Sequence, residues 1–189
     1  MIGLLELIDS NYADLDFPVK SELPYVLATC YDRLGREDEA IEWYKKTIEQ
    51  YPTSRYAPRA AYRIGVIYAQ EKKENENAIY WFEKQMELYP EQAEKALHFI
   101  QVIYVHRLGE WVKGAEACQQ YMERYPDGRQ VCGSLCNMAF CLKMLGDREE
   151  AKELLWQAYD RAESDNLRAE IMYEIERLEK GDGNGGESE

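Results

Sequence analysis

A Tyr-Pro pair recurs three times along the chain, and its spacing constrains the fold more than any other feature. The pairs are Tyr51-Pro52, Tyr89-Pro90 and Tyr125-Pro126, at intervals of 38 and 36 residues. Because a proline cannot continue an α-helix, each pair predicts the end of a helical segment. Apolar residues recur three and four positions apart through almost the whole chain, and no run alternates with a period of two. The spacing therefore predicts an all-α protein built from repeats.

The segments that end in Tyr-Pro share further positions. A small residue stands twelve positions before each proline, at Ala40, Ala78 and Gly114, and Ala151 continues the series at steps of 38, 36 and 37. Four positions after each small residue comes a larger one: Tyr44, Phe82, Cys118 and Leu155. Each repeat also carries an upstream pattern, as Leu27-Ala28-x2-Tyr31, Ile64-Gly65-x2-Tyr68, Ile100-Gln101-x2-Tyr104 and Met138-Ala139-x2-Leu142. Small residues allow two helices to cross closely, so each repeat is predicted to be a pair of antiparallel helices.

This arrangement resembles the tetratricopeptide repeat, whose pattern is W-x2-L-G-x2-Y, then A-x3-F, then P. The resemblance covers residues 18–163 in four copies, and the third copy departs from it at Gln101 and Cys118. It implies a right-handed α-solenoid of antiparallel helix pairs, a superhelix of about ten helices. The longer connection YPTSRYAP, residues 51–58, resembles that of bacterial cell-envelope repeat proteins, namely the β-barrel assembly lipoproteins and the Tol–Pal-associated proteins.

The repeat positions predict one solenoid domain over residues 1–180 and a disordered acidic tail over residues 181–189. Within the domain we expect a half-repeat, four repeats and a closing helix, over residues 1–17, 18–54, 55–90, 91–127, 128–163 and 164–180. The half-repeat includes a helix over about residues 2–12. A start in mid-repeat leaves two interpretations open, a native cap or a fragment of a longer array of repeats.

The composition disfavours several kinds of partner. The net charge of −13 disfavours nucleic acids and anionic membranes, because phosphate binding requires clustered Lys and Arg. No apolar run is long enough to span a membrane, so no direct membrane insertion is expected. The absence of a signal-peptide pattern and the odd number of cysteines, five, favour the cytoplasm. The resemblance to cell-envelope repeats keeps the periplasm or cell envelope as the alternative.

Residues with metal-binding or redox chemistry are few. His98 and His106, the only histidines, share a helix face but stand about 12 Å apart along its axis, too far for one metal ion. Cys132 and Cys136 share a face, while Cys141 lies about half a turn away, so we expect these cysteines to pack as small apolar residues. A metal or redox sensor built on the cysteines is an alternative. No catalytic or cofactor-binding motif occurs, so neither enzymatic activity nor a cofactor is predicted.

The first helices of the four repeats are less acidic than the rest of the chain. Over residues 21–34, 58–72, 91–108 and 128–145 they hold eight basic and five acidic residues. The family resemblance places these helices on the concave face, where the ligand-facing positions correspond to Tyr25, Thr29, Arg59, Tyr62, Arg63, Val66, Lys95, His98, Phe99, Val102, Asn137 and Phe140.

These positions predict a groove that binds a peptide or protein segment. Arginine and tyrosine commonly anchor protein interfaces, and we expect acidic groups of the partner to reach Arg59, Arg63 and Lys95. The alternative for these charges is that they only balance neighbouring glutamates. The alternative for the whole chain is a structural scaffold that assembles through its terminal half-repeats, and the oligomeric state is left open.

Overall fold

A computed structural model describes Leu7 and residues 20–180, and these described residues form nine α-helices and no strand. The helices are α2 (Leu23–Arg33), α3 (Glu37–Gln50), α4 (Ala57–Ile67), α5 (Asn75–Leu88), α6 (Glu94–Val102), α7 (Trp111–Arg124), α8 (Val131–Leu145), α9 (Arg148–Arg161) and α10 (Asp165–Lys180). The π-helical turns η2 (Tyr68–Lys72) and η4 (Ile103–Leu108) continue α4 and α6, and the 3-10 turn η3 (Pro90–Gln92) precedes α6. The predicted all-α class is confirmed. The predicted helix over residues 2–12, Leu7 excepted, and the tail over 181–189 lie outside the described residues.

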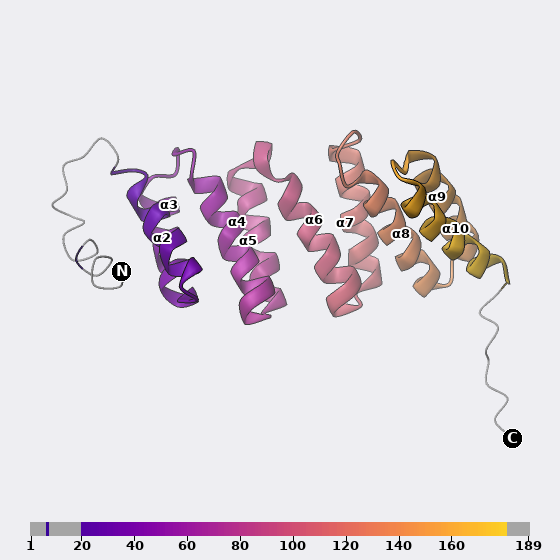
Figure 1. Ribbon diagram of the computed structural model, residues 1–189, viewed down its shortest axis with the longest axis horizontal. Coiled ribbons are helices and arrows are strands. Elements are labelled where there is room, and N and C mark those ends of the chain that lie inside the picture. Colours follow the sequence, from indigo (N-terminus) through magenta and orange to yellow (C-terminus); the bar gives the residue numbers. More distant parts are fainter. Residues whose placement is uncertain (1–6, 8–19, 181–189) are drawn as a thin grey trace, which may run out of the picture. The chain divides into compact units, whose positions relative to one another are not determined.

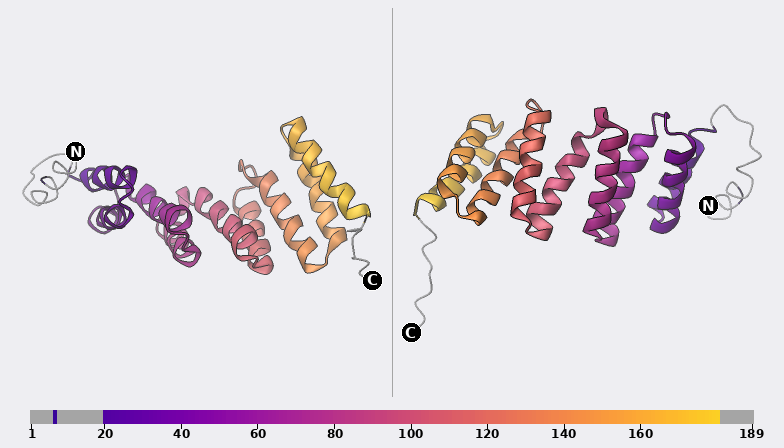
Figure 2. Two further views of the ribbon diagram at one scale, coloured as in Figure 1. Left: turned by 60° about the horizontal axis from the view of Figure 1, so that its bottom comes forward. Right: turned by 180° about the vertical axis from the view of Figure 1, so that it is seen from behind.

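The helices divide into two compact units between Ala93 and Glu94. In the N-terminal unit α2 packs on α3, α3 on α4, and α4 on α5. In the C-terminal unit α6 packs on α7, α7 on α8, α8 on α9, and α9 on α10. Figure 1 shows that consecutive helices within each unit run antiparallel, and Figure 2 shows the same pairs from two further directions. The exact bounds of the repeats stay a prediction.

The Tyr-Pro pairs end three of these helices with one backbone conformation. Tyr51, Tyr89 and Tyr125 have φ of −135°, −136° and −132° and ψ of 56°, 62° and 64°. A following proline disfavours the α conformation, so each tyrosine leaves the helix although its N–H still donates to the carbonyl four residues back. α9 has no such pair after it and ends differently, at Ala162 with ψ 126°.

A left-handed residue ends the first helix of every pair. Gly35, Lys73, Gly109 and Gly146 have φ of 67°, 56°, 65° and 100°, at intervals of 38, 36 and 37 residues. Glycine adopts this conformation without a steric penalty. Lys73 is the one other residue with positive φ in the described part of the chain. The same turn therefore occurs four times, once with an unfavourable side chain.

The two π-helical turns each absorb one inserted residue. Tyr31 and Leu142 precede their left-handed residues by four positions, whereas Tyr68 and Tyr104 precede theirs by five. In all four pairs the N–H just after the left-handed residue donates to the carbonyl of this Tyr or Leu, at 3.0, 2.8, 3.0 and 2.9 Å in chain order. A π-helical turn holds one more residue than an α-helical turn, so the turn keeps its closing hydrogen bond despite the insertion.

Glycines mark the closest contacts between helices. A Cβ atom added at Gly65 would lie 2.7 Å from the Phe82 ring, so the aromatic side chain of α5 lies directly against the backbone of α4. At Gly114 a Cβ atom would lie 2.8 Å from Val105 Cγ2 and 3.0 Å from Cys141 Sγ. The distances of 2.7 and 2.8 Å are shorter than a real Cβ contact allows, which confirms that small residues are needed where these helices cross.

Replacing Lys73 with glycine should stabilise the protein. Lys73→Gly removes the steric penalty of a left-handed lysine, and we expect a gain in the free energy of unfolding of about 0.5–1 kcal/mol in urea denaturation. The matched control is Gly35→Lys, because Gly35 has nearly the same φ and an added Cβ would meet only Glu37 Oε1 at 3.8 Å. That variant should lose a similar amount. If both variants are neutral, the left-handed turn does not limit stability.

Candidate functional site

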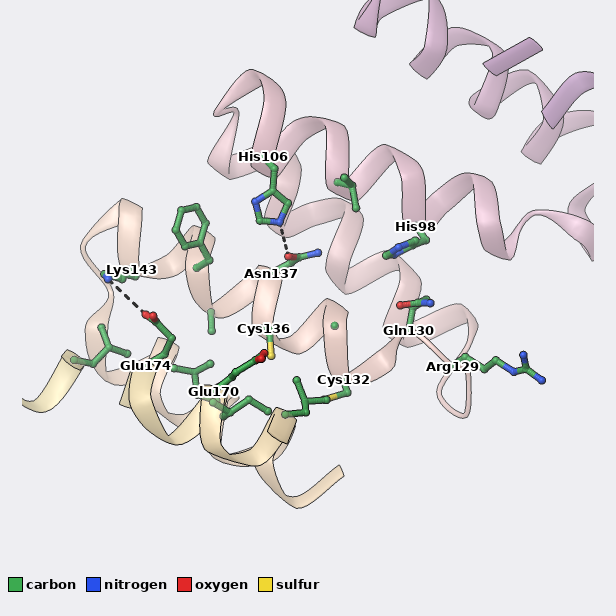
Figure 3. A pocket seen from close by; sticks show the side chains of 18 residues that line it. His98, His106, Arg129, Gln130, Cys132, Cys136, Asn137, Lys143, Glu170 and Glu174 are labelled. Carbon is green, nitrogen blue, oxygen red and sulfur yellow. Dashed lines mark hydrogen bonds and ion pairs between the residues drawn. The ribbon is translucent and has the colours of Figure 1, made fainter. Parts of the chain in front are cut away.

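The C-terminal unit contains a cavity of about 610 Å³, shown in Figure 3. Its walls come from the first helices of the pairs, α6 with η4 and α8, and from α10, with Leu155 of α9 also contributing. The apolar lining consists mainly of Val102, Phe140, Leu155, Leu167, Ile171 and Leu178. Phe140 remains 38% exposed although it contacts the rings of His106 and Trp111. The volume and the apolar lining are typical of ligand-binding sites in proteins.

Hydrogen-bonding side chains lie along the side of the cavity formed by α6 and α8. His106 Nε2 is 2.9 Å from Asn137 Oδ1, and Figure 3 shows His98 on the same side. His98 Nδ1 is buried without a hydrogen-bond partner among the described residues. Burial lowers the pKa of His98, opposed by the nearby Glu94, so this ring is neutral at pH 7. His98 and Asn137 therefore offer uncharged polar groups on this side of the cavity.

Two of the four charged residues that line the cavity are paired with each other. Lys143 Nζ lies 4.0 Å from Glu174 Oε2, and the other oxygen of Glu174 lies 2.9 Å from Arg177 Nη1. Glu170 makes no ion pair with any residue that the structure describes, and in Figure 3 it extends toward Cys136. Arg129 points away from the other labelled side chains. Glu170 is therefore the one uncompensated charge directed into the cavity, within the described residues.

The cysteines of the cavity are protonated and therefore weak nucleophiles. Burial raises the pKa of Cys132, and it raises that of Cys136 to about 12. Cys118 and Cys141 are buried in the helix contacts. Within residues 20–180 no cluster of three or more His, Cys, Asp or Glu could hold a metal ion. These thiols pack and line the cavity, as small apolar residues do.

Gly133 lines the cavity in the first turn of α8 without a packing reason for a glycine. A Cβ atom added there would meet only Gln130 Oε1, at 3.6 Å. Glycine disfavours helix by up to about 1 kcal/mol relative to alanine. No contact within the described chain requires a glycine at this position. The absence of a side chain at Gly133 therefore leaves space in the cavity.

Gln101, the unusual residue of the third repeat, connects three helices. Its side chain is 0% exposed, its Nε2 donates to the carbonyl of Ala117 at 3.4 Å, and its Oε1 accepts from Ser134 Oγ at 2.9 Å. A buried amide is stable only when its polar atoms are bonded. Gln101 stands where the other repeats have a small residue, and the cost of burying its amide is offset by hydrogen bonds to α7 and α8.

The structure brings four of the twelve predicted groove residues into this cavity: His98, Val102, Asn137 and Phe140. Lys95 and Phe99 lie on α6 but are not part of the lining. Sequence reasoning missed the lining residues Gly133, Cys136 and Lys143 of α8, Gln130 just before it, and Glu170 and Glu174 of α10. Helical spacing from Asn137 and Phe140 could have found those on α8.

The remaining predicted residues lie in the N-terminal unit: Tyr25, Thr29, Arg59, Tyr62, Arg63 and Val66. Thr29 donates to the carbonyl of Tyr25, and the Tyr25 ring stacks on Tyr56. Tyr62 contacts Phe82, and Val66 is buried. Arg59 is exposed and makes no ion pair within the described part of the unit.

Arg63 is bound by a carboxylate of its own chain. Its Nε and Nη2 donate to Asp32 Oδ2 at 3.0 and 2.6 Å, and the Tyr44 hydroxyl donates to the same oxygen at 3.1 Å. Asp32 thus connects α4, α2 and α3. For Arg63 this contact agrees with the alternative that the basic residues only balance acidic neighbours, although the neighbour is an aspartate and not a glutamate.

Comparisons with known proteins identify the repeats. Two tetratricopeptide repeat family models match, over residues 25–54 and 58–92. A tetratricopeptide repeat protein from Parabacteroides merdae has a similar structure, with a TM-score of 0.64, 16% identity, and coverage of 95% of this chain and 70% of the other. MamA 41-end from Desulfovibrio magneticus RS-1 has a TM-score of 0.58 and 14% identity, with coverage of 87% of this chain and 97% of the other. BtubC from P. vanneervenii has a TM-score of 0.61 and 16% identity, with coverage of 99% of this chain and 78% of the other. No curated protein sequence matches significantly.

The chain therefore carries tetratricopeptide repeats over residues 25–54 and 58–92, and its described residues have an all-α repeat fold. Such repeats generally mediate protein–protein interactions and are typically non-catalytic scaffolds. None of the described helices has the length and apolar character needed to cross a membrane. The narrower resemblance to cell-envelope repeats stays a prediction.

Alanine substitution should distinguish the two kinds of helical glycine. Gly133→Ala should raise the free energy of unfolding by about 0.5 kcal/mol, because alanine favours the helix and meets open space. Gly65→Ala should lower it by about 1–3 kcal/mol, because the added methyl group overlaps the Phe82 ring. Urea denaturation measures both, and a loss of stability in Gly133→Ala would contradict the assignment of open space at Gly133.

Reversing Arg63 should destabilise the N-terminal unit. Arg63→Glu places a second carboxylate beside Asp32, and we expect a loss of about 1–2 kcal/mol, limited by the partial exposure of the pair. Arg59→Glu is the matched control and should leave the melting temperature nearly unchanged. Equal melting temperatures for both variants would show that the Asp32 contact contributes nothing to stability.

Proposed function

We propose that the protein is a non-enzymatic interaction module whose cavity in the C-terminal unit binds a peptide or protein segment. The observation that carries the proposal is the cavity itself, because its apolar surface is left uncovered by the described chain. An apolar surface lined by a few uncharged polar groups suits a segment that contributes both side chains and main-chain amides. Asn137 and Gln130 carry amide groups that can pair with such a main chain.

The exposed face of α10 favours this proposal over end-to-end assembly. Stacking through α10 requires an apolar face for the next helix, yet six residues of α10 form ion pairs with one another. The pairs are Asp165–Arg168, Glu174–Arg177 and Glu176–Lys180. Arg177 also lies over the exposed ring of Tyr173. A polar outer face is typical of a helix that caps a repeat array, so the scaffold stays the second candidate.

The N-terminal unit supplies a further contact surface in this proposal. Arg59 is exposed and not ion-paired within the described residues, and Tyr25 and Tyr56 form a stacked pair in the same unit. Acidic groups of a partner would bind Arg59 there, while Arg63 stays with Asp32. Lys95 keeps its predicted role as an exposed cation of α6.

Filling the cavity tests the proposal. Peptides are selected on the wild-type protein from a phage-displayed random library, and their affinities are then measured by fluorescence anisotropy. Gly133→Leu should weaken the selected peptides about tenfold or more, which corresponds to about 1.4 kcal/mol, because the leucine side chain occupies the cavity. Gly133→Ala is the size-matched control and should bind nearly as well as wild type.

Thermal denaturation must show that Gly133→Leu remains folded for the comparison to count. Selected peptides that bind this folded variant with unchanged affinity would place the interaction outside the cavity. Failure to select any peptide would also contradict segment binding.

A further inference from the structure

We propose that the cavity of the C-terminal unit receives a cationic side chain of the bound segment, an arginine or a lysine, whose charged end binds Glu170. This inference rests on the proposed function and names the chemistry of its partner. It differs from the predicted acidic contacts of Arg59 and Lys95, which lie outside the cavity lining.

The first argument is the balance of charge inside the cavity. Four charged residues line it: Arg129, Lys143, Glu170 and Glu174. Lys143 and Glu174 face each other at 4.0 Å, and Glu174 is also bound by Arg177. Arg129 points away in Figure 3, and His98 on the opposite wall is neutral. Glu170 is therefore the one lining charge that is directed into the cavity without an ion-pair partner among the described residues.

The second argument is what happens to Glu170 when a segment covers it. A covered carboxylate loses water, and without a new partner this loss is unfavourable. An apolar or acidic side chain over Glu170 would impose that cost, whereas a guanidinium or ammonium group replaces the lost water with a charged hydrogen bond. The pair also strengthens as water is excluded.

The third argument is the surface that leads to Glu170. Leu167 lies about one turn before Glu170 on α10, and Ile171 follows Glu170 directly. Gly133 leaves room on the facing helix α8. Arginine and lysine have apolar stems that lie on such surfaces while the charged end reaches a polar group. Cys136, toward which Glu170 extends, has a protonated thiol and adds no charge.

The charge of the whole chain supports the same partner. At −13 the protein attracts cationic segments over a distance and repels acidic ones. Uniform attraction would not select a position on the surface. Glu170, an exposed residue in the lining of the apolar cavity and unpaired among the described residues, provides that position.

Reversal of Glu170 provides the test. Short synthetic peptides are immobilised with the central residue fixed as Arg, Lys, Leu or Glu and the other positions randomised. They are probed with wild type, Glu170→Lys and the control Glu179→Lys, and individual retained peptides are then measured by fluorescence anisotropy. Glu179 is on the same helix, exposed and outside the cavity lining, so its reversal changes the net charge equally.

We expect wild type to retain the Arg- and Lys-centred peptides. Glu170→Lys should weaken them about tenfold or more and improve retention of the Glu-centred peptides, while Glu179→Lys should behave nearly as wild type. A wild-type preference for Leu- or Glu-centred peptides would overturn the inference. So would equal behaviour of the two reversal variants.

The Gly133→Leu variant separates this failure from failure of the proposed function. If wild type retains no peptide, or if Gly133→Leu retains all of them, then no segment binds in the cavity. In that case both the proposed function and the cationic contact are wrong. If Gly133→Leu loses binding but Glu170→Lys has no effect beyond its control, the cavity binds a segment and only the cationic contact is wrong.

Discussion

The C-terminal unit depends on one close helix contact, at Gly114 of α7. Its backbone lies against Val105 of η4 and Cys141 of α8, at distances that leave no room for a Cβ atom. Since α7 touches both neighbours at this residue, the contact sets how far apart the two lie. That separation allows His106 of η4 to hydrogen-bond to Asn137 of α8, along the side of the cavity that α6 and α8 form. Gly114, a small residue on α7, thus determines the shape of the cavity surface that α6 and α8 form.

The role proposed for the cavity is recognition of a bound segment. The thiols are kept protonated by burial, and the His98 ring is neutral. Hydrogen-bonding groups stand along one side, and an apolar surface faces them from α10. A bound segment could use all of these features without any bond being made or broken. This agrees with the general role of tetratricopeptide repeats in protein interactions.

Local signals made much of the fold predictable. The Tyr-Pro pairs predicted helix ends, because proline acts on the residue before it, and the small residues predicted the crossing points at Gly65 and Gly114. The π-helical turns could not be predicted in the same way, since one inserted residue can be absorbed in several ways and the hydrogen-bond pattern decides. The partners of Gln101 on α7 and α8 lie 16 and 33 residues away, beyond the range of helical periodicity.

The candidate site was only partly predictable. His98, Val102, Asn137 and Phe140 followed from the repeat positions. The contribution of α10 did not, because residues 164–180 were predicted only as a closing helix and no site residue was expected there. The bond between Arg63 and Asp32 spans 31 residues, so a residue expected to face a ligand instead joins two helices.

Nuclear Overhauser effects between the protein and a bound peptide test the central claim most directly. The peptide is one selected on the wild-type protein, and isotope filtering keeps only intermolecular signals. We expect signals from the peptide to the Phe140 ring and the Val102 methyl groups, which line the cavity. Signals confined to exposed residues outside its lining, such as Val112 and Trp156, would contradict it.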